Sequence, residues 1–173
     1  MPPADADPSA GADPAAELIA LLVARGLTIA VAESLTGGLV VAELTRIPGA
    51  SAVVRGGVVA YATPVKHSVL GVSAALLEQE GAVHPEVART MADGVRRALA
   101  VDGVPAAIGV STTGVAGPDP QDGRPPGVVF VGVAIAERVE AFELDLHGDR
   151  DEIRRATVEA AIVAVLASVL AEA

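Results

Sequence analysis

The sequence predicts a layered α/β domain in which a mixed β-sheet is flanked by helices. Segments with helical spacing of apolar residues alternate along the chain with short, continuous apolar runs that are typical of buried strands. Two apolar runs, 128–136 and 139–146, are separated only by a turn at Glu137-Arg138 and predict a hairpin, which makes the sheet mixed. A chain of 173 residues is long enough for one sizeable core and short for two independent domains.

The first fourteen residues differ in composition from the rest of the chain. They are acidic and rich in Pro and Ala, and they lack the basic and apolar regions of a signal peptide. We therefore interpret residues 1–14 as a disordered tail and residues 15–173 as the folded domain.

Helices and strands alternate through the first part of this domain. Apolar spacing predicts a helix at 15–25, with Gly26 as its C-terminal stop. The elements expected after it are a strand at 27–32, a helix at 36–47 ended by Pro48-Gly49, a strand at 53–61, a loop or short helix at 62–67, a short helix within 71–80, a longer helix at 85–100, and a strand at 104–111.

A glycine- and proline-rich stretch, 112–127, follows the last of these strands. Its sequence, T-T-G-V-A-G-P-D-P-Q-D-G-R-P-P-G, predicts a loop, and a loop of this length in a compact domain is usually functional. Beyond the hairpin, Asp149 and Glu152 match a capping box for a terminal helix that runs to about Leu170. Because ligands of open α/β sheets bind beyond the carboxyl ends of strands, we expect this loop and the turn after 27–32 to face one crevice.

The stretch 29–38, I-A-V-A-E-S-L-T-G-G, joins the first predicted strand to the next helix through a tight turn. Glycines let the backbone approach a ligand, and a helix N-terminus offers unpaired N–H groups and the positive end of the helix dipole. Ser34 lies at the mouth of this turn and is therefore the best nucleophile candidate in the chain. Serine is also a preferred N-cap residue, so a purely structural role for Ser34 stays open on the sequence.

Charge and composition exclude several classes of function. A net charge of −10 argues against a general nucleic-acid or anionic-membrane surface, and two Phe, one Tyr and no Trp leave no platform for base stacking. The absence of cysteine excludes disulfides, thiolate metal sites and cysteine nucleophiles, and the three histidines do not have metal-ligand spacing. We therefore expect a cytoplasmic protein without a metal or a cofactor, while Ala- and Val-rich helical faces permit a homo-oligomer.

Six short segments occur in the order found in one protein family. They are A-E-S-L-T-G-G at 32–38, G-G-V-V-A-Y at 56–61 followed by Lys66, L-G-V at 70–72, G-A-V at 81–83, T-G-V-A-G-P at 113–118, and G-D-R with I-R at 148–154. Through these segments the chain resembles the CinA C-terminal domain family over roughly residues 15–170. That family takes its name from competence- and damage-inducible proteins, and its characterised activity is deamidation of nicotinamide mononucleotide.

The resemblance implies an amidohydrolase of pyridine nucleotide salvage that converts nicotinamide mononucleotide to nicotinate mononucleotide and ammonia. It also implies the stand-alone form of the family, since some members carry a further N-terminal domain related to molybdopterin-binding proteins. Two departures from the family pattern bear on the substrate. The segment that commonly reads Y-S-N-x-x-K is Y-A-T-P-V-K at 61–66, and His84 replaces a serine after G-A-V.

Hydrolysis of a carboxamide needs an activated nucleophile, a proton donor and stabilisation of an oxyanion. The resemblance implies that Ser34 is the nucleophile and Lys66 its base, which requires that burial or a nearby positive charge lowers the pKa of the lysine. Tyr61, the only tyrosine, could relay or donate a proton. The backbone N–H groups of Leu35 and Thr36 are candidates for the oxyanion hole.

The same resemblance assigns the nucleotide half of the substrate to glycine-rich turns and to one arginine. Glycine-rich backbone can surround a phosphate, and the guanidinium fork of an arginine matches phosphate oxygens. On a protein this acidic, such a local site would be necessary. The expected substrate-binding residues are Glu33, Thr36, Gly37, Gly38, Thr113, Gly114, Gly117 and Arg150.

Two other functions stay open on the sequence: a non-catalytic module that binds a nucleotide for regulation, and a hydrolase of a related nucleotide amide. Taken singly, Lys66 would more often be a solvated lysine and Tyr61 a half-buried strand residue. Arg150 would more often pair with local acids. Only the joint occurrence of these residues with Ser34, in family order, favours the catalytic interpretation.

Overall fold

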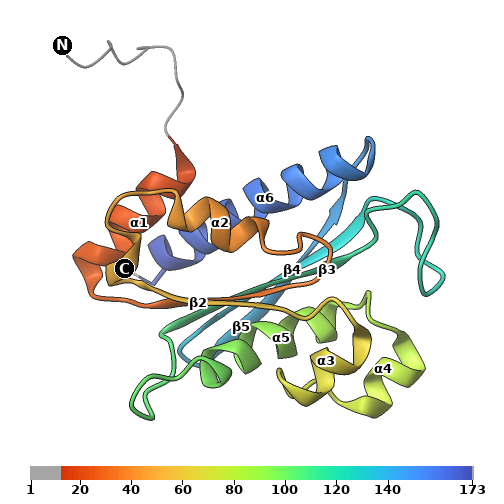
Figure 1. Ribbon diagram of the computed structural model, residues 1–173, viewed down its shortest axis with the longest axis horizontal. Coiled ribbons are helices and arrows are strands. Elements are labelled where there is room, and N and C mark those ends of the chain that lie inside the picture. The colour runs from red at the N-terminus through yellow and green to blue at the C-terminus, as the bar shows by residue number, and fades with distance from the viewer. Residues whose placement is uncertain (1–12, 173) are drawn as a thin grey trace.

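Five strands form one mixed sheet in the spatial order β2-β1-β3-β4-β5. Figure 1 shows the computed structural model, which describes residues 13–172. Strand β1 pairs in parallel with β2 and with β3, whereas β3, β4 and β5 pair in antiparallel fashion. The strands are β1 (Ile29–Glu33), β2 (Val54–Val59), β3 (Ile108–Gly114), β4 (Val128–Ile135) and β5 (Arg138–Asp145). The predicted mixed sheet with a late hairpin is confirmed.

Helices cover both faces of the sheet. They are α1 (Pro14–Arg25), α2 (Leu39–Thr45), α3 (Thr63–Ser68), α4 (Ala74–Glu80), α5 (Pro85–Ala98) and α6 (Arg150–Leu170), with a 3₁₀ turn η1 (Ala50–Ala52). Figure 1 shows α1, α2 and α6 on one face and α3, α4 and α5 on the other. Among residues 13–172, no helix combines the length with the apolarity that crossing a membrane requires.

Strand β1 lies between β2 and β3 and separates two apolar cores. Its odd-numbered residues pack with apolar side chains of α1, α2 and α6, and its even-numbered residues pack with those of α5 and of the segment before it. Successive side chains of a strand point to opposite faces. The alternation therefore directs Glu33 toward α2 and the next residue, Ser34, toward the face that carries α3.

The helix expected at 36–47 begins later than predicted. Residues 34–38 form a turn, and helix α2 starts at Leu39. The turn is possible because Gly37 and Gly38 adopt left-handed backbone with φ of 62° and 102°, which side chains other than glycine disfavour. These two glycines therefore end the approach from β1 and set the direction of α2.

The strand expected at 104–111 is also shifted along the chain. Strand β3 begins at Ile108 and continues to Gly114, because residues 112–114 pair with β4. Thr113 and Gly114 thus belong to a buried strand rather than to the loop. The segment 62–67, predicted as a loop or a short helix, is helix α3.

The N-terminal tail predicted at 1–14 falls largely outside the described residues, which begin at Asp13. Asp13 is the N-cap of α1 and accepts hydrogen bonds from the backbone N–H groups of Ala15 and Ala16. Pro14 is the first residue of the helix. These two residues therefore belong to the start of α1.

Candidate active site

The side chains of Ser34 and Lys66 meet at the carboxyl end of strand β1. Ser34 is the first residue after β1, and Lys66 lies on helix α3. Lys66 Nζ donates a hydrogen bond to Ser34 Oγ at 3.0 Å and another to the carbonyl oxygen of Ala60 at 2.7 Å. The two residues are 32 positions apart in the sequence, so only the fold brings them together.

Lys66 is almost fully buried, with 1% of its surface exposed. Burial lowers the pKa of Lys66 to about 8, against an opposing effect of the Asp122 carboxylate. A lysine with this pKa is partly neutral at neutral to slightly alkaline pH, and a neutral amine can accept a proton. The pair therefore has the geometry and the protonation state that an activated serine needs.

The carboxylate of Glu33, and not the hydroxyl of Ser34, caps helix α2. Its oxygens accept hydrogen bonds from the backbone N–H groups of Gly38 at 3.0 Å, Val40 at 3.0 Å and Val41 at 2.9 Å. A carboxylate at a helix N-terminus is stabilised both by these donors and by the helix dipole. Glu33 is fully buried and committed to this contact. It therefore supports the turn instead of reaching a substrate, and the hydroxyl of Ser34 is left for chemistry.

Backbone hydrogen bonds hold the turn that carries Ser34. The N–H of Ser34 donates to the carbonyl oxygen of Thr112 at 3.0 Å, and the N–H of Gly37 donates to the carbonyl oxygen of Ser34 at 3.1 Å. Within residues 13–172, the N–H groups of Leu35 and Thr36 have no protein acceptor. They adjoin the nucleophile candidate and can bind an oxyanion.

A polar pocket of about 130 Å³ is lined by Ser34. It is formed by the turn after β1, the residue that follows β2 by two positions, the loop after β3, and the start of α6. Arg150 joins two of these segments, since its Nη1 donates to the carbonyl oxygen of Gly117 at 2.7 Å and its Nη2 to Tyr61 Oη at 3.0 Å. The lining residues are Ser34, Leu35, Tyr61, Gly114, Val115, Ala116, Gly117, Asp119, Gln121 and Arg150.

Five of the residues singled out in the sequence lie together in this pocket. They come from four separate segments and are Ser34, Tyr61, Gly114, Gly117 and Arg150. Lys66 is not part of the lining and lies behind Ser34, in hydrogen-bond contact with it.

Two predicted substrate-binding threonines turn their hydroxyls into the protein. Thr36 Oγ1 lies 2.8 Å from Thr112 Oγ1, and Thr113 Oγ1 donates to the carbonyl oxygen of Ala82 at 2.6 Å. Both side chains are buried and neither lines the pocket. Gly37 and Gly38 are likewise outside the lining and shape the turn.

Three polar residues of the loop at 112–127 were missed by sequence reasoning. Asp119 and Gln121 line the pocket, and the carboxylate of Asp122 accepts a hydrogen bond from the N–H of Ala82 at 2.8 Å. The length of the loop was the only signal. Nothing within D-P-Q-D distinguishes a side chain that faces the pocket from one that faces solvent.

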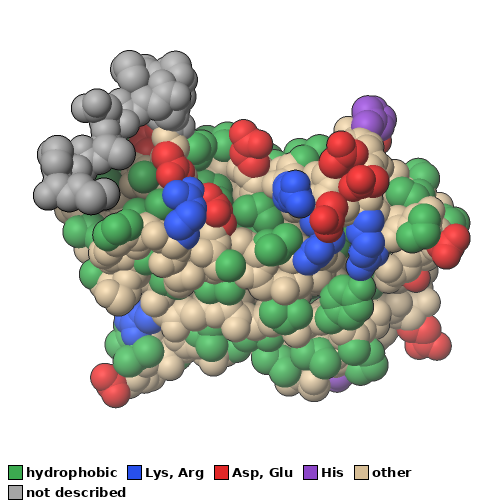
Figure 2. All heavy atoms as spheres, turned by 45° about the horizontal axis from the view of Figure 1, so that its top comes forward, with side chains coloured by type: hydrophobic (Ala, Val, Ile, Leu, Met, Phe, Trp, Pro, Cys, Tyr) green, Lys and Arg blue, Asp and Glu red, His purple; other side chains and the backbone are tan. Residues whose placement is uncertain are grey.

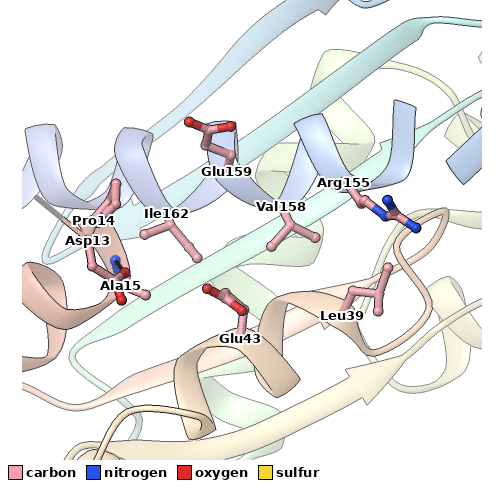
Figure 3. Close-up of a pocket in the computed structure, with 9 residues that line it drawn as sticks. All are labelled: Asp13, Pro14, Ala15, Leu39, Glu43, Arg155, Val158, Glu159 and Ile162. Atoms are coloured by element: carbon pink, nitrogen blue, oxygen red, sulfur yellow. Dashed lines mark hydrogen bonds between the residues drawn. The ribbon is translucent and has the colours of Figure 1, made fainter. Parts of the chain in front are cut away.

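A larger hollow of about 370 Å³ lies between α1, α2 and α6, on the other face of the sheet (Figure 3). Figure 3 shows the carboxylates of Asp13, Glu43 and Glu159 and the guanidinium of Arg155 around apolar side chains. The described residues around this hollow include neither a hydroxyl nor a lysine. The smaller polar pocket is therefore the candidate active site.

Charges on the face seen in Figure 2 are mixed. Lys and Arg side chains are interspersed there with Asp and Glu side chains over the described helices, and no broad basic area is present on that face. An anionic ligand would therefore depend on individual cations such as Arg150 at the pocket.

The fold and the site together define a layered α/β domain with a serine–lysine pair at the carboxyl end of a central parallel strand. The model of the CinA C-terminal domain matches residues 12–169. The chain therefore belongs to the CinA C-terminal domain family, and the prediction made from six short motifs is confirmed.

Similar sequences are found in several bacteria. A CinA-like protein of Frankia casuarinae is 48% identical over 154 residues, which are 88% of this chain and 34% of that protein. A protein of Geobacillus kaustophilus, named as competence-damage inducible, is 52% identical over 136 residues, which are 78% of this chain and 32% of that protein. The chain thus spans about a third of the length of these curated relatives.

Solved structures share the fold. A CinA superfamily protein from Klebsiella pneumoniae superposes with a TM-score of 0.85 at 27% identity, covering 91% of this chain and 96% of that one. The competence/damage inducible protein CihA from Agrobacterium tumefaciens has a TM-score of 0.79 at 33% identity, with 93% and 98% covered. The α/β architecture is therefore that of the CinA superfamily.

Proposed function

We propose that the protein hydrolyses the carboxamide of nicotinamide mononucleotide to give nicotinate mononucleotide and ammonia. One observation carries the proposal: the buried Lys66 donates a hydrogen bond to Ser34 Oγ at 3.0 Å, beside a polar pocket that Ser34 lines. The substrate class is supported by membership of the CinA C-terminal domain family, whose characterised activity is this deamidation.

Ser34 is acylated in the first half of the proposed reaction. Neutral Lys66 accepts the proton of Ser34 Oγ while Oγ attacks the carboxamide carbon. The tetrahedral intermediate breaks its C–N bond when the proton passes from Lys66 to the nitrogen. Ammonia leaves, a nicotinoyl ester remains on Ser34, and Lys66 is neutral again.

Water completes the reaction in the second half. Lys66 accepts a proton from a water molecule as its oxygen attacks the ester carbon. The proton then passes to Ser34 Oγ as the ester C–O bond breaks, and nicotinate mononucleotide is released. Both tetrahedral intermediates carry a negative oxygen, for which the N–H groups of Leu35 and Thr36 are the proposed donors.

Arg150 is the proposed partner of the substrate phosphate. Its guanidinium is exposed and already directs N–H groups at two oxygens in the pocket region, so a phosphate can take over these contacts. The hydroxyl of Tyr61 bonds Arg150 rather than Ser34 or Lys66. We therefore assign Tyr61 to substrate binding in preference to proton transfer.

The two departures from the family pattern do not favour a different nucleotide amide. Residues 62–64 lead into helix α3, and His84 is the N-cap of α5, whose Nδ1 accepts a hydrogen bond from the N–H of Glu86 at 3.2 Å. His84 thus does the work that a serine can do at this position. None of these residues lines the pocket.

Ammonia release tests the proposal. Purified protein is incubated with nicotinamide mononucleotide, and ammonia and nicotinate mononucleotide are measured, with Ser34→Ala in parallel. We expect the two products in equal amounts from the wild type and neither from the variant. Binding of the nucleotide without release of ammonia would favour a regulatory binding module instead.

A further inference from the structure

We propose that Arg154 is a positioning residue that orients the backbone N–H groups of Leu35 and Thr36 as an oxyanion hole. The inference rests on the proposed function, because it assigns those N–H groups to a negative oxygen formed during attack by Ser34. Arg154 lies on helix α6, one helical turn beyond Arg150. It does not line the pocket and acts from behind the turn.

The guanidinium of Arg154 bonds two consecutive carbonyl groups of the turn. Its Nε donates to the carbonyl oxygen of Leu35 at 3.0 Å, and its Nη2 donates to that of Thr36 at 3.1 Å. The side chain is only 25% exposed. The contact joins segments more than 110 residues apart, since the separations are 119 and 118 positions.

These two bonds fix the direction of the peptide planes next to Ser34. In a trans peptide the C=O and the following N–H point in opposite directions. Because Arg154 holds the carbonyl of Leu35, the N–H of Thr36 points away from the guanidinium. The carbonyl of Ser34 is held by the N–H of Gly37 at 3.1 Å, which in the same way fixes the N–H of Leu35.

The carbonyl of Thr36 is the third one of the turn that is held. Its bond to Arg154 fixes the N–H of Gly37, which is the donor to Ser34. All three peptide planes between Ser34 and Gly37 are therefore set, two of them by one side chain. The two N–H groups that remain without a protein acceptor in the described chain are those of Leu35 and Thr36.

Packing and charge strengthen this arrangement. The side chain of Leu35 is buried against Ile153 of α6, together with Ala116 and Val129, so the turn is docked on the same helix. The guanidinium also places a positive charge beneath the turn, which favours a negative oxygen on its other side. A lysine could keep the charge but not the planar fork that serves two carbonyls.

Arg155 offers a matched control. It is the next residue, it pairs with the same carboxylate of Asp151 at 3.4 Å as Arg154 does, and its side chain is 77% exposed. Its contact with Asp151 is the only hydrogen bond that it makes within the described residues. Arg155→Ala therefore removes the same charge and the same surface pair without touching the turn.

Steady-state kinetics of ammonia release on Arg154→Ala, Arg154→Lys and Arg155→Ala tests the proposal. Loss of an oxyanion-hole donor lowers kcat by about 100-fold or more, and we expect a loss of that order for Arg154→Ala. KM should change by less than about threefold, because the interaction is made in the transition state. Arg154→Lys should lose about 10-fold, since one carbonyl contact can remain, and Arg155→Ala should stay within about twofold. Millimolar guanidinium should restore part of the kcat of Arg154→Ala.

A second readout does not depend on the natural substrate. A fluorophosphonate forms a tetrahedral adduct on an activated serine, and its rate of attachment to Ser34 can be followed by intact mass. We expect slow labelling of both Arg154 variants and wild-type labelling of Arg155→Ala. A folded Arg154→Ala with wild-type kcat and labelling overturns the proposal, and if that variant does not fold, a folded Arg154→Lys with wild-type values does so.

The two proposals fail in different ways. If the wild type releases no ammonia from nicotinamide mononucleotide but its Ser34 is labelled, the proposed substrate is wrong and the labelling rates alone decide the role of Arg154. If the wild type shows neither turnover nor labelling, both proposals are overturned. Turnover by the wild type with unchanged Arg154 variants overturns only the role of Arg154.

Discussion

Lys66 Nζ lies 3.0 Å from Ser34 Oγ while 1% of the lysine surface is exposed, so the contact and the burial belong to one arrangement. Burial opposes the charged form of an amine, which is why the pKa of Lys66 falls to about 8. The hydrogen bonds to Ser34 and Ala60 use donors that the neutral amine retains in part. Ser34 thus has a base beside it that is able to change its protonation state near neutral pH.

The pH dependence of turnover follows from this pKa. A proton leaves Lys66 as the pH rises, so the neutral, proton-accepting fraction grows, and kcat/KM should increase through about pH 8 and then level off. Lys66→Arg should remain folded and lose nearly all activity, because a guanidinium does not deprotonate in this range. A pH–rate profile of both proteins is the measurement. A wild-type rate for the arginine variant would reduce Lys66 to a fixed positive charge.

The Asp122 carboxylate should set the position of that profile. Its charge raises the pKa of Lys66 against the effect of burial, so Asp122→Asn should lower the pKa and move the rising limb of kcat/KM toward lower pH. The asparagine oxygen can still accept the hydrogen bond from the N–H of Ala82, which preserves the loop contact.

A matched variant tests whether that shift is local. Asp102 is exposed in the turn before strand β3, at the end of that strand away from Ser34, and its backbone has a positive φ of 52° that asparagine tolerates. Asp102→Asn removes the same charge, and its pH profile should coincide with that of the wild type. An equal displacement in both variants would point to net charge as the cause.

Glu33 should matter for stability before it matters for substrate binding. Glu33→Gln removes a charged acceptor from three backbone N–H groups at the start of α2, and we expect a loss of about 2 kcal/mol in the free energy of unfolding. Chemical denaturation measures this loss. Glu159→Gln makes the same change on an exposed face of α6 and should cost less than about 0.5 kcal/mol. Similar stabilities for the two variants would contradict the assignment of Glu33 as the cap.

Arg150 should distinguish a nucleotide from a nucleoside. Arg150→Ala should weaken turnover of nicotinamide mononucleotide far more than turnover of nicotinamide riboside, because only the nucleotide carries the phosphate. The comparison of kcat/KM for the two substrates measures this difference. Equal losses on both substrates would mean that Arg150 serves to hold Gly117 and Tyr61 in place.

The fold was largely predictable because its signals are local. Apolar spacing, Gly26 after α1 and the capping box of α6 each act within a few residues, and these elements are found where they were expected. The start of α2 was misjudged because its cap is a carboxylate five positions before the N-cap residue Gly38. A side chain at that distance is not part of any helix-start pattern read from sequence.

The site was predictable only in part because its contacts are long-range. The approach of Lys66 to Ser34 could be expected from family motifs and not from spacing. The bonds of Arg154 to the turn depend on how the N-terminal turn of α6 lies against β1, and local sequence contains no trace of this. The same holds for Asp119 and Gln121, whose orientation follows from the path of the loop.

The account stands on Ser34 as a nucleophile. Ser34→Ala should abolish turnover of nicotinamide mononucleotide, with a loss of several orders of magnitude in kcat, as with other serine nucleophiles. Binding of the nucleotide should persist, because Arg150 and the loop after β3 are unchanged. The free energy of unfolding should fall by no more than about 1 kcal/mol, since the hydroxyl bonds only Lys66 among the described residues.

Trapping of the acyl-enzyme is the most direct measurement. Wild-type protein is mixed with nicotinamide mononucleotide, quenched in acid within the first turnovers, digested and analysed by peptide mass. The account predicts a nicotinoyl nucleotide adduct on the peptide that contains Ser34, and its absence from Ser34→Ala. An Ser34→Ala protein that keeps substantial turnover and shows no adduct would contradict the account, and water would then be the nucleophile.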